Sequence, residues 1–204
     1  IYDGAKIYQN GTSSYVGAIV GASYNATMNI YGGYGKSAKC GIIVMSTGAT
    51  INVSGGEWIA NNDGTVANDN NAVLVSQNNR YESSWACKSI LNVTGGTFKG
   101  GYNCYGMGPG VEPDDAQINI KGGNFNANPA SYVVAGYESV EENGVWTVGK
   151  PKALADFEAA IAEGGNVTLA SDVTLLETIT IENEVVIDLN GKTLTTANNH
   201  GGMT

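Results

Sequence analysis

The sequence has 204 residues, enough for one domain or for a domain and part of a second. It contains 29 glycines and 4 prolines without a three-residue glycine period, which excludes collagen. A hydrophobic share of 42% excludes a disordered chain, and the net charge of −9 argues against nucleic acid or anionic membranes as partners. No apolar run approaches the roughly 18 residues of a membrane span.

Four segments of the first 150 residues share one short pattern, which marks an internal repeat. In each, an apolar residue, Asn and a second apolar residue are followed by any residue and then Gly-Gly. The four segments are 28–33, 51–56, 91–96 and 118–123. A further apolar stretch lies upstream of each segment. The pattern predicts a strand, a turn, a second strand and a Gly-Gly turn in every repeat.

This repeat predicts an all-β chain folded as a right-handed parallel β-helix, in which each strand pairs with the equivalent strand of the next repeat. Alternation within Ile51-Asn52-Val53 is expected to point the two aliphatic side chains inward and the amide outward. The glycine pairs are expected to supply the positive φ angles of the corners; they are Gly32, Gly33, Gly55, Gly56, Gly95, Gly96, Gly122 and Gly123. An antiparallel sandwich with irregular turns is the alternative fold.

Residues 151–204 follow a different pattern. Leu154, Phe157 and Ile161 are spaced i, i+3, i+7 over 152–163, which predicts a short amphipathic helix. Pro151 favours its start and Gly164-Gly165 its end. Five short β stretches follow, at 167–169, 173–175, 179–181, 185–189 and 193–195. We therefore expect two parts, 1–150 with the Gly-Gly repeats and 151–204 with a cap helix and initial strands.

The runs 154–169 and 186–194 resemble the opening of pectate-lyase-like right-handed parallel β-helix domains. Such domains occur in large secreted proteins of gut bacteria and in phage fibres. Residues 51–146 are similar to the later coils of that family, and residues 124–148 to its usual ending. The resemblance implies that the helix caps the first coil of a β-helix. It implies little about activity, because the family includes both enzymes and inert fibres.

The order of these parts is reversed relative to the family, since the ending precedes the cap. Residues 1–150 supply about five or six coils, a stack of roughly 25 Å, whereas the linker 149–151 reaches only about 10 Å. We therefore expect residues 151–204 to cap the residue-1 end of a neighbouring copy, in a covalent tandem array or in a head-to-tail polymer of separate chains. The assembly residues would be Leu154, Phe157, Ile161, Leu194 and Ile7. Alternatively, the chain follows a longer loop path back to its own first coil, or residues 151–204 begin an unrelated second domain.

Residues that could carry catalysis are sparse. A lyase on this scaffold would need clustered carboxylates for calcium and a basic residue that abstracts a proton. The only arginine, Arg80, and the only histidine, His200, both lie in predicted loops. The one tight acidic cluster outside the last third, Glu112 with Asp114 and Asp115, is typical of an exposed turn. We predict no catalytic residue, no cofactor and no metal site, so the chain is not expected to be an enzyme.

Three smaller features leave alternatives open. The loop 61–65, together with 69–71, offers oxygen ligands for calcium, or else forms Asx turns. The three cysteines, Cys40, Cys87 and Cys104, allow a Cys87–Cys104 disulfide or buried free thiols. Surface carbohydrate is a second candidate partner, through a stacking face that would include Tyr31, Tyr34, Tyr102 and Tyr105.

Charged residues form only 14% of the chain, and its polarity comes from Asn, Thr, Ser and Gly, as in β-rich extracellular proteins. We therefore expect a non-enzymatic structural module of an extracellular fibre or appendage, on a cell or virion surface. Its main partner would be another copy of itself, without nucleic acid and without a membrane span. The alternative is a polysaccharide-binding or polysaccharide-cleaving β-helix protein.

Overall fold

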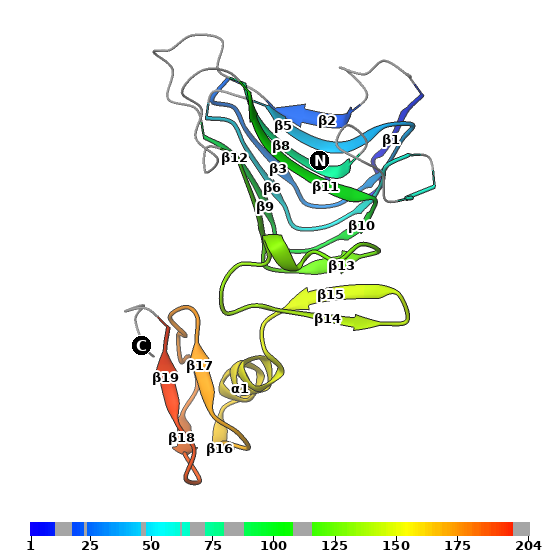
Figure 1. Cartoon of the computed structure of the whole chain (residues 1–204). Helices are drawn as coiled ribbons and strands as arrows, with labels where there is room; N and C mark the ends of the chain where they lie inside the picture. The colour runs from blue at the N-terminus through cyan, green and yellow to red at the C-terminus, as the bar shows by residue number, and fades with distance from the viewer. Residues whose placement is uncertain are drawn as a thin grey trace. The chain divides into compact units, whose positions relative to one another are not determined.

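The computed structural model describes residues 1–10, 18–22, 24–45, 48–61, 63–65, 72–79, 88–107 and 116–197 (Figure 1). The chain divides into two compact units. Unit 1 comprises residues 1–134 and 139–149, and unit 2 comprises residues 135–138 and 150–204. Each unit is described separately below.

Unit 1 consists mainly of three sheets of parallel strands. The first sheet runs in the order β1 (Lys6–Gln9), β4 (Tyr34–Ser37), β7 (Glu57–Ile59), β10 (Thr97–Lys99), β13 (Gly123–Phe125), β15 (Val145–Gly149) and β14 (Glu138–Glu142). The second contains β2 (Ala18–Ala22), β5 (Cys40–Met45), β8 (Ala72–Asn79) and β11 (Gly101–Met107). The third contains β3 (Thr27–Ile30), β6 (Thr50–Val53), β9 (Ser89–Val93) and β12 (Ala116–Ile120). From β2 to β13, every three consecutive strands therefore contribute one strand to each sheet.

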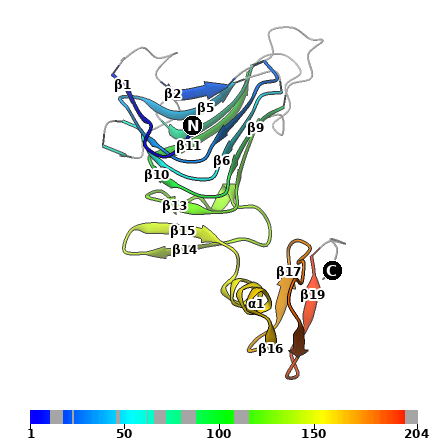
Figure 2. The ribbon, with the colours of Figure 1, turned by 180° about the vertical axis from the view of Figure 1, so that it is seen from behind.

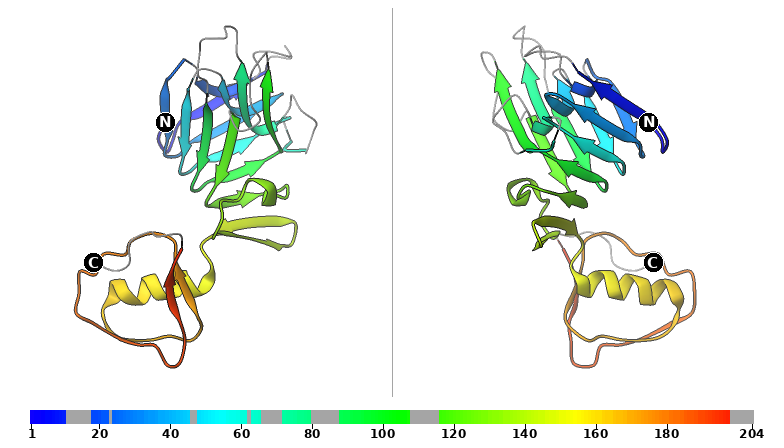
Figure 3. Two further views of the ribbon diagram at one scale, coloured as in Figure 1. Left: turned by 60° about the vertical axis from the view of Figure 1, so that its left-hand side comes forward. Right: turned by 90° about the vertical axis from the view of Figure 1, so that its right-hand side faces the viewer.

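The predicted pairing of equivalent strands is confirmed on the third sheet (Figure 3). Its strands are parallel and in register, so that four asparagines lie opposite one another: Asn29, Asn52, Asn92 and Asn119. The predicted alternation is also correct, because Ile51 and Val53 are buried whereas Asn52 between them is half-buried. The antiparallel sandwich is wrong for these strands. The chain is thus β-rich and built on parallel sheets.

Aromatic side chains fill the inner side of the first sheet. Trp58, Phe98 and Phe125 occupy equivalent positions on neighbouring strands and are almost fully buried. The Phe98 and Phe125 ring centroids are 5.1 Å apart, and the Trp58 indole N–H donates to the Gly55 carbonyl at 3.0 Å. Gly35 lies opposite Trp58 on β4, where a Cβ would come within 2.6 Å of the indole ring. The row of large rings therefore requires glycine, which has no side chain, at position 35.

The Gly-Gly corners differ from the prediction. Only the second glycine of each pair has a positive φ angle: Gly33 (108°), Gly56 (94°), Gly96 (113°) and Gly123 (120°). The first glycine is required for space, because a Cβ on Gly95 would lie 2.6 Å from the Ser54 carbonyl oxygen of the preceding repeat. Gly55 and Gly122 are crowded in the same way by preceding carbonyl groups, and Gly32 by the side chain of Asp3. The expectation that both glycines supply positive φ angles was wrong for the first of each pair.

Unit 2 combines one helix with two small parallel sheets (Figure 2). The predicted helix is confirmed as α1 (Lys152–Glu163), which ends at Gly164 with φ of 84°. Strand β16 (Gly165–Thr168) pairs with β18 (Val185–Asp188), and β17 (Val173–Leu175) pairs with β19 (Leu194–Thr196). The stretch 179–181 is not a strand, although Ile179 and Ile181 pack against the core. Within the described residues, no helix is long and apolar enough to cross a membrane.

Candidate functional site: open and closed ends of the parallel sheets

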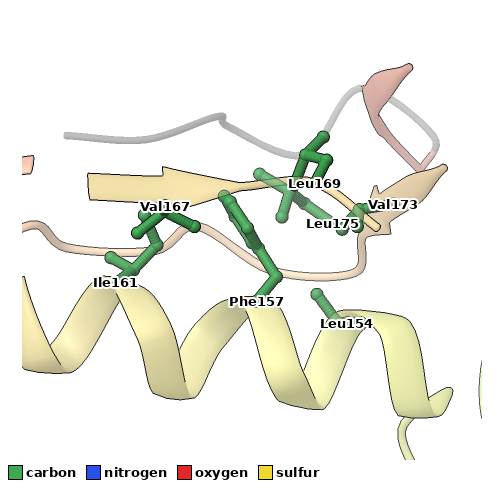
Figure 4. Packing of buried hydrophobic residues seen from close by; sticks show 7 residues of the cluster. All are labelled: Leu154, Phe157, Ile161, Val167, Leu169, Val173 and Leu175. Atoms are coloured by element: carbon green, nitrogen blue, oxygen red, sulfur yellow. The ribbon is translucent and has the colours of Figure 1, made fainter. Parts of the chain in front are cut away.

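The helix α1 closes one side of the core of unit 2 (Figure 4). Its buried face consists of Leu154, Phe157 and Ile161, each at most 3% exposed. These side chains pack against four buried residues of the following strands and turns: Val167, Leu169, Val173 and Leu175. The solvent face carries the ion pair Lys152–Asp156 at 2.8 Å. The helix is therefore amphipathic and terminates the apolar core on its side.

On the other side of unit 2 the core is incompletely covered. Val167 on β16 is buried, but its partner Ile187 on β18 is only half-buried. Val173 and its partner Leu194 on β19 differ in the same way. Val186, between Val185 and Ile187, points away from this core and is 60% exposed. Strands β18 and β19 are the last of their sheets among the described residues. Within the described part of the chain, this end therefore presents unpaired strand edges and half-buried apolar side chains.

Unit 1 has a corresponding open end. Strands β1, β2 and β3 are the outermost of the three parallel sheets in the described part of the chain. Ile7 on β1 lies opposite Gly35, faces the interior row of the first sheet and is half-buried. Tyr2 and Tyr8 close to this edge are among the most exposed large side chains, and the Tyr2 ring stacks on Tyr31 with centroids 5.0 Å apart.

The opposite edge of the first sheet of unit 1 is closed by a change of strand direction. Strand β15 pairs antiparallel with β13, which places Trp146 opposite Phe125. Strand β14 follows β15 in the sheet, and Asn143 and Gly144 between them have the positive φ angles of a tight hairpin turn. The outermost strand exposes Glu138, Glu141 and Glu142. Charged edge strands oppose further pairing, so this hairpin ends the first sheet.

The assembly residues predicted from sequence therefore belong to two kinds of place. Leu154, Phe157 and Ile161 form the closed side of unit 2. Leu194 and Ile7 lie on the edge strands β19 and β1. The sequence did not identify Val186 and Ile187 as edge residues, although both lie in the predicted strand 185–189. It also missed the closing hairpin, whose Asn-Gly turn was a usable signal.

The other candidates named from the sequence are the two isolated basic residues, the acidic cluster, the cysteines and the loop 61–65. Arg80, His200, Glu112, Asp114, Asp115 and Cys87 are outside the described residues. In the loop 61–65, the Thr65 N–H donates to Asp63 at 2.9 Å, and the Asn61 amide donates to the Thr65 carbonyl at 3.0 Å. The hydrogen bond from Thr65 lowers the pKa of Asp63. The bond from Thr65 to Asp63 is that of an Asx turn. No cluster of three His, Cys, Asp or Glu side chains suited to a metal occurs in the described part.

The tyrosines of the predicted stacking face lie on different strands. The Tyr102 hydroxyl donates to the Ala127 carbonyl at 2.8 Å beside Phe125, several strands away from Tyr31 and Tyr34, and burial raises the pKa of Tyr102. The tyrosines therefore do not share one face, and the side chain of Tyr105 lies outside the described residues.

Cys40 and Cys104 are free thiols, and Cys104 donates to the Ala116 carbonyl at 2.6 Å. Cys104 thus takes the free-thiol alternative.

No family model matches the chain, and comparisons with curated proteins and with solved structures also return no match. The open and closed sheet ends are therefore interpreted from their own geometry.

Proposed function

We propose that unit 1 and the strands of unit 2 are segments of a right-handed parallel β-helix, and that the chain is a non-enzymatic structural module of an extracellular fibre. Copies would join head to tail, the open end of unit 2 completing the open end of unit 1 in the next copy. The observation that carries this proposal is that both units present parallel edge strands, β1 in unit 1 and β18 and β19 in unit 2, whereas a hairpin ends the other edge of the first sheet and α1 covers the other side of unit 2. Such heterologous contacts propagate into filaments.

Chain connectivity favours completion between copies over completion within one chain. If β18 paired with β1 of its own chain, five steps of the first sheet from β15 to β1 and two further steps to β16 would separate β15 from β16. At the inter-strand spacing this is about 34 Å. The linker between Gly149 and Lys152 spans about 10 Å and the 12-residue helix α1 about 18 Å, so together they are too short even when laid end to end. The partner is therefore a neighbouring copy, whether a separate chain or the next period of a tandem array.

The proposed extracellular setting is supported by the composition of the chain and by the resemblance to β-helix domains of secreted proteins and phage fibres. The polarity of the chain comes mostly from Asn, Thr, Ser and Gly residues, and only 14% of residues are charged. A stiff rod built from such repeats would carry its variable loops on the outside. This assigns to the chain a role in propagating a rod and displaying loops.

The direct test is negative-stain electron microscopy of the purified chain, together with sedimentation velocity over a range of concentrations. We expect filaments whose axial period matches one copy. A chain that stays monomeric at high concentration, while circular dichroism shows both helix and strand signals, would contradict the proposal.

An edge variant separates specific assembly from nonspecific aggregation. Ile7→Lys places a charge on the inward side of β1 and is expected to abolish filaments, because the charge would be buried in the completed core. Val140→Lys on β14 is the matched control, since this exposed valine lies at the closed end of unit 1. The control should form filaments like the parent chain.

A further inference from the structure

The open edge of β18 has a defined pattern of backbone groups. The carbonyl groups of Glu184 and Asp188 accept hydrogen bonds from Gly165 and Leu169 on the β16 side, at 2.8 and 2.9 Å. In a parallel sheet, successive residues direct their backbone groups to alternate sides of the strand. The N–H and C=O groups of Val185 and Ile187 therefore face the open edge.

The open edge of β1 has the matching pattern. The carbonyl groups of Ala5 and Gln9 accept hydrogen bonds from Tyr34 and Ala38, at 2.8 and 3.0 Å. By the same alternation, the backbone groups of Lys6 and Tyr8 face away from β4 and toward the open edge. The side chain of Ile7, between them, faces inward in the row that continues through Gly35 to Trp58.

From these two patterns we infer that β18 of one copy pairs in parallel with β1 of the next, with Ile187 opposite Ile7. This inference rests on the proposed function. In this register the Ile187 N–H donates to the Lys6 carbonyl, and the Tyr8 N–H donates to the Ile187 carbonyl. Val167, Ile187 and Ile7 then form one continuous apolar row, because Val167 already lies opposite Ile187.

Other registers are less favourable. A shift by one residue would turn the exposed side chains of one strand into the core. A shift by two residues would place Gln9 opposite Ile187. This shift would put the polar Gln9 amide, which accepts a hydrogen bond from Ser37 at 3.1 Å, into the apolar row. A shift by two residues in the opposite direction would leave β18 and β1 with a single pair of facing residues. Because β1 begins at Lys6 and β18 ends at Asp188, only Asp188 would lie opposite a residue of β1.

The outward side chains support the same register. With Ile187 opposite Ile7, Lys6 lies diagonal to Asp188, one pair along the same face. Diagonal neighbours in a sheet are within reach of long side chains. Unit 1 contains such a pair, because Glu57 lies opposite Thr97 and bonds Lys99 at 2.7 Å. The junction would repeat this arrangement with the charges exchanged.

Disulfide trapping between separate chains tests the register. In a background with Cys40, Cys87 and Cys104 replaced by alanine, chains with Val186→Cys are mixed with chains with Lys6→Cys or, in parallel, with Tyr8→Cys. Mild oxidation should link Val186→Cys to Lys6→Cys, which lie directly opposite, about tenfold faster than to Tyr8→Cys on the diagonal, since disulfides require close Cβ atoms.

The outcomes separate the two proposals. Filaments in which Tyr8→Cys is trapped as fast or faster would overturn the register but leave head-to-tail assembly intact. Filaments without either disulfide would also overturn the register. Folded chains without filaments and without disulfides would overturn the proposed function and the inference with it.

A charge reversal provides a second readout in the natural cysteine background. Lys6→Glu should weaken assembly by about fivefold, because like charges on neighbouring strands repel. Asp188→Lys should restore assembly when combined with Lys6→Glu in the same chain, since each junction then regains a pair. Glu142→Lys is the control, because Glu142 is exposed on β14, at the edge of the first sheet opposite to β1. Rescue by Glu142→Lys as strong as that by Asp188→Lys would overturn the inference.

Discussion

At the residue scale, the clearest signature of the repeat is a ladder of asparagine side chains. The Asn92 amide donates to Asn52 at 2.9 Å and accepts from Asn119 at 3.1 Å, while Asn52 donates to Asn29 at 2.9 Å. Each inner rung thus uses its amide once as donor and once as acceptor. The ladder connects neighbouring strands of the third sheet on the side facing away from the core.

Replacing Asn92 by Asp should therefore destabilise unit 1 by about 1–2 kcal/mol, because the donor to Asn52 is lost and two oxygen atoms face each other. Asn29→Asp is the matched control: Asn29 is the end rung of the ladder and only accepts a hydrogen bond, from Asn52, so the change should be nearly neutral. Urea unfolding followed by tryptophan fluorescence measures both, as all three tryptophans lie before residue 150. Equal losses for the two variants would contradict the ladder argument.

Gly35 provides a second prediction at this scale. Gly35→Ala should destabilise unit 1 by about 1–3 kcal/mol, since the new Cβ would lie within 2.7 Å of both Trp58 and Ile19. Gly149→Ala serves as control, because a Cβ there meets no heavy atom within 4 Å. Thermal unfolding followed by Trp fluorescence measures the difference; a neutral Gly35→Ala would show that the row of aromatic rings can shift.

At the element scale, α1 supplies one wall of the core of unit 2. Phe157→Ala should lower the stability of unit 2 by about 3–5 kcal/mol, because it removes a buried aromatic side chain from a core of seven residues. The exposed Glu163→Ala should change it by less than about 0.5 kcal/mol. Helix ellipticity reports on unit 2 and tryptophan fluorescence on unit 1, so a simultaneous loss of both signals would contradict separate cores.

At the scale of the whole molecule, charge differs between the two open ends. Residues 182–192 carry Glu182, Glu184 and Asp188 against Lys192, whereas residues 1–45 carry Lys6, Lys36 and Lys39 against Asp3. Opposite charges at the junction are screened by salt. We expect the critical concentration for filaments to rise severalfold between about 0.02 M and about 0.5 M NaCl. Sedimentation of filaments measures it. The double variant Lys6→Gln with Asp188→Asn should show a smaller salt effect; an unchanged one would contradict the charge argument.

Prediction from sequence succeeded where local periodicity decides the structure. Alternation around Asn52 predicted the buried and exposed sides of the strand. The spacing of Leu154, Phe157 and Ile161 predicted α1, and Pro151 and Gly164 predicted its ends. It failed at the first glycine of each corner, because crowding at Gly95 comes from Ser54 in another repeat. Such contacts between repeats have no local signal in the sequence.

The repeat, the strand faces and the amphipathic helix 152–163 could be read from the amino-acid sequence alone, because spacing of apolar residues along the chain specifies which side of a strand or helix is buried. Which strand edges are paired and which are outermost became known from the fold. The antiparallel turn of β15 onto β13 closes one end, and β1 and β18 remain outermost in their sheets among the described residues. The physical reason is that edge exposure depends on the order and direction of strands in a sheet, which long-range pairing sets.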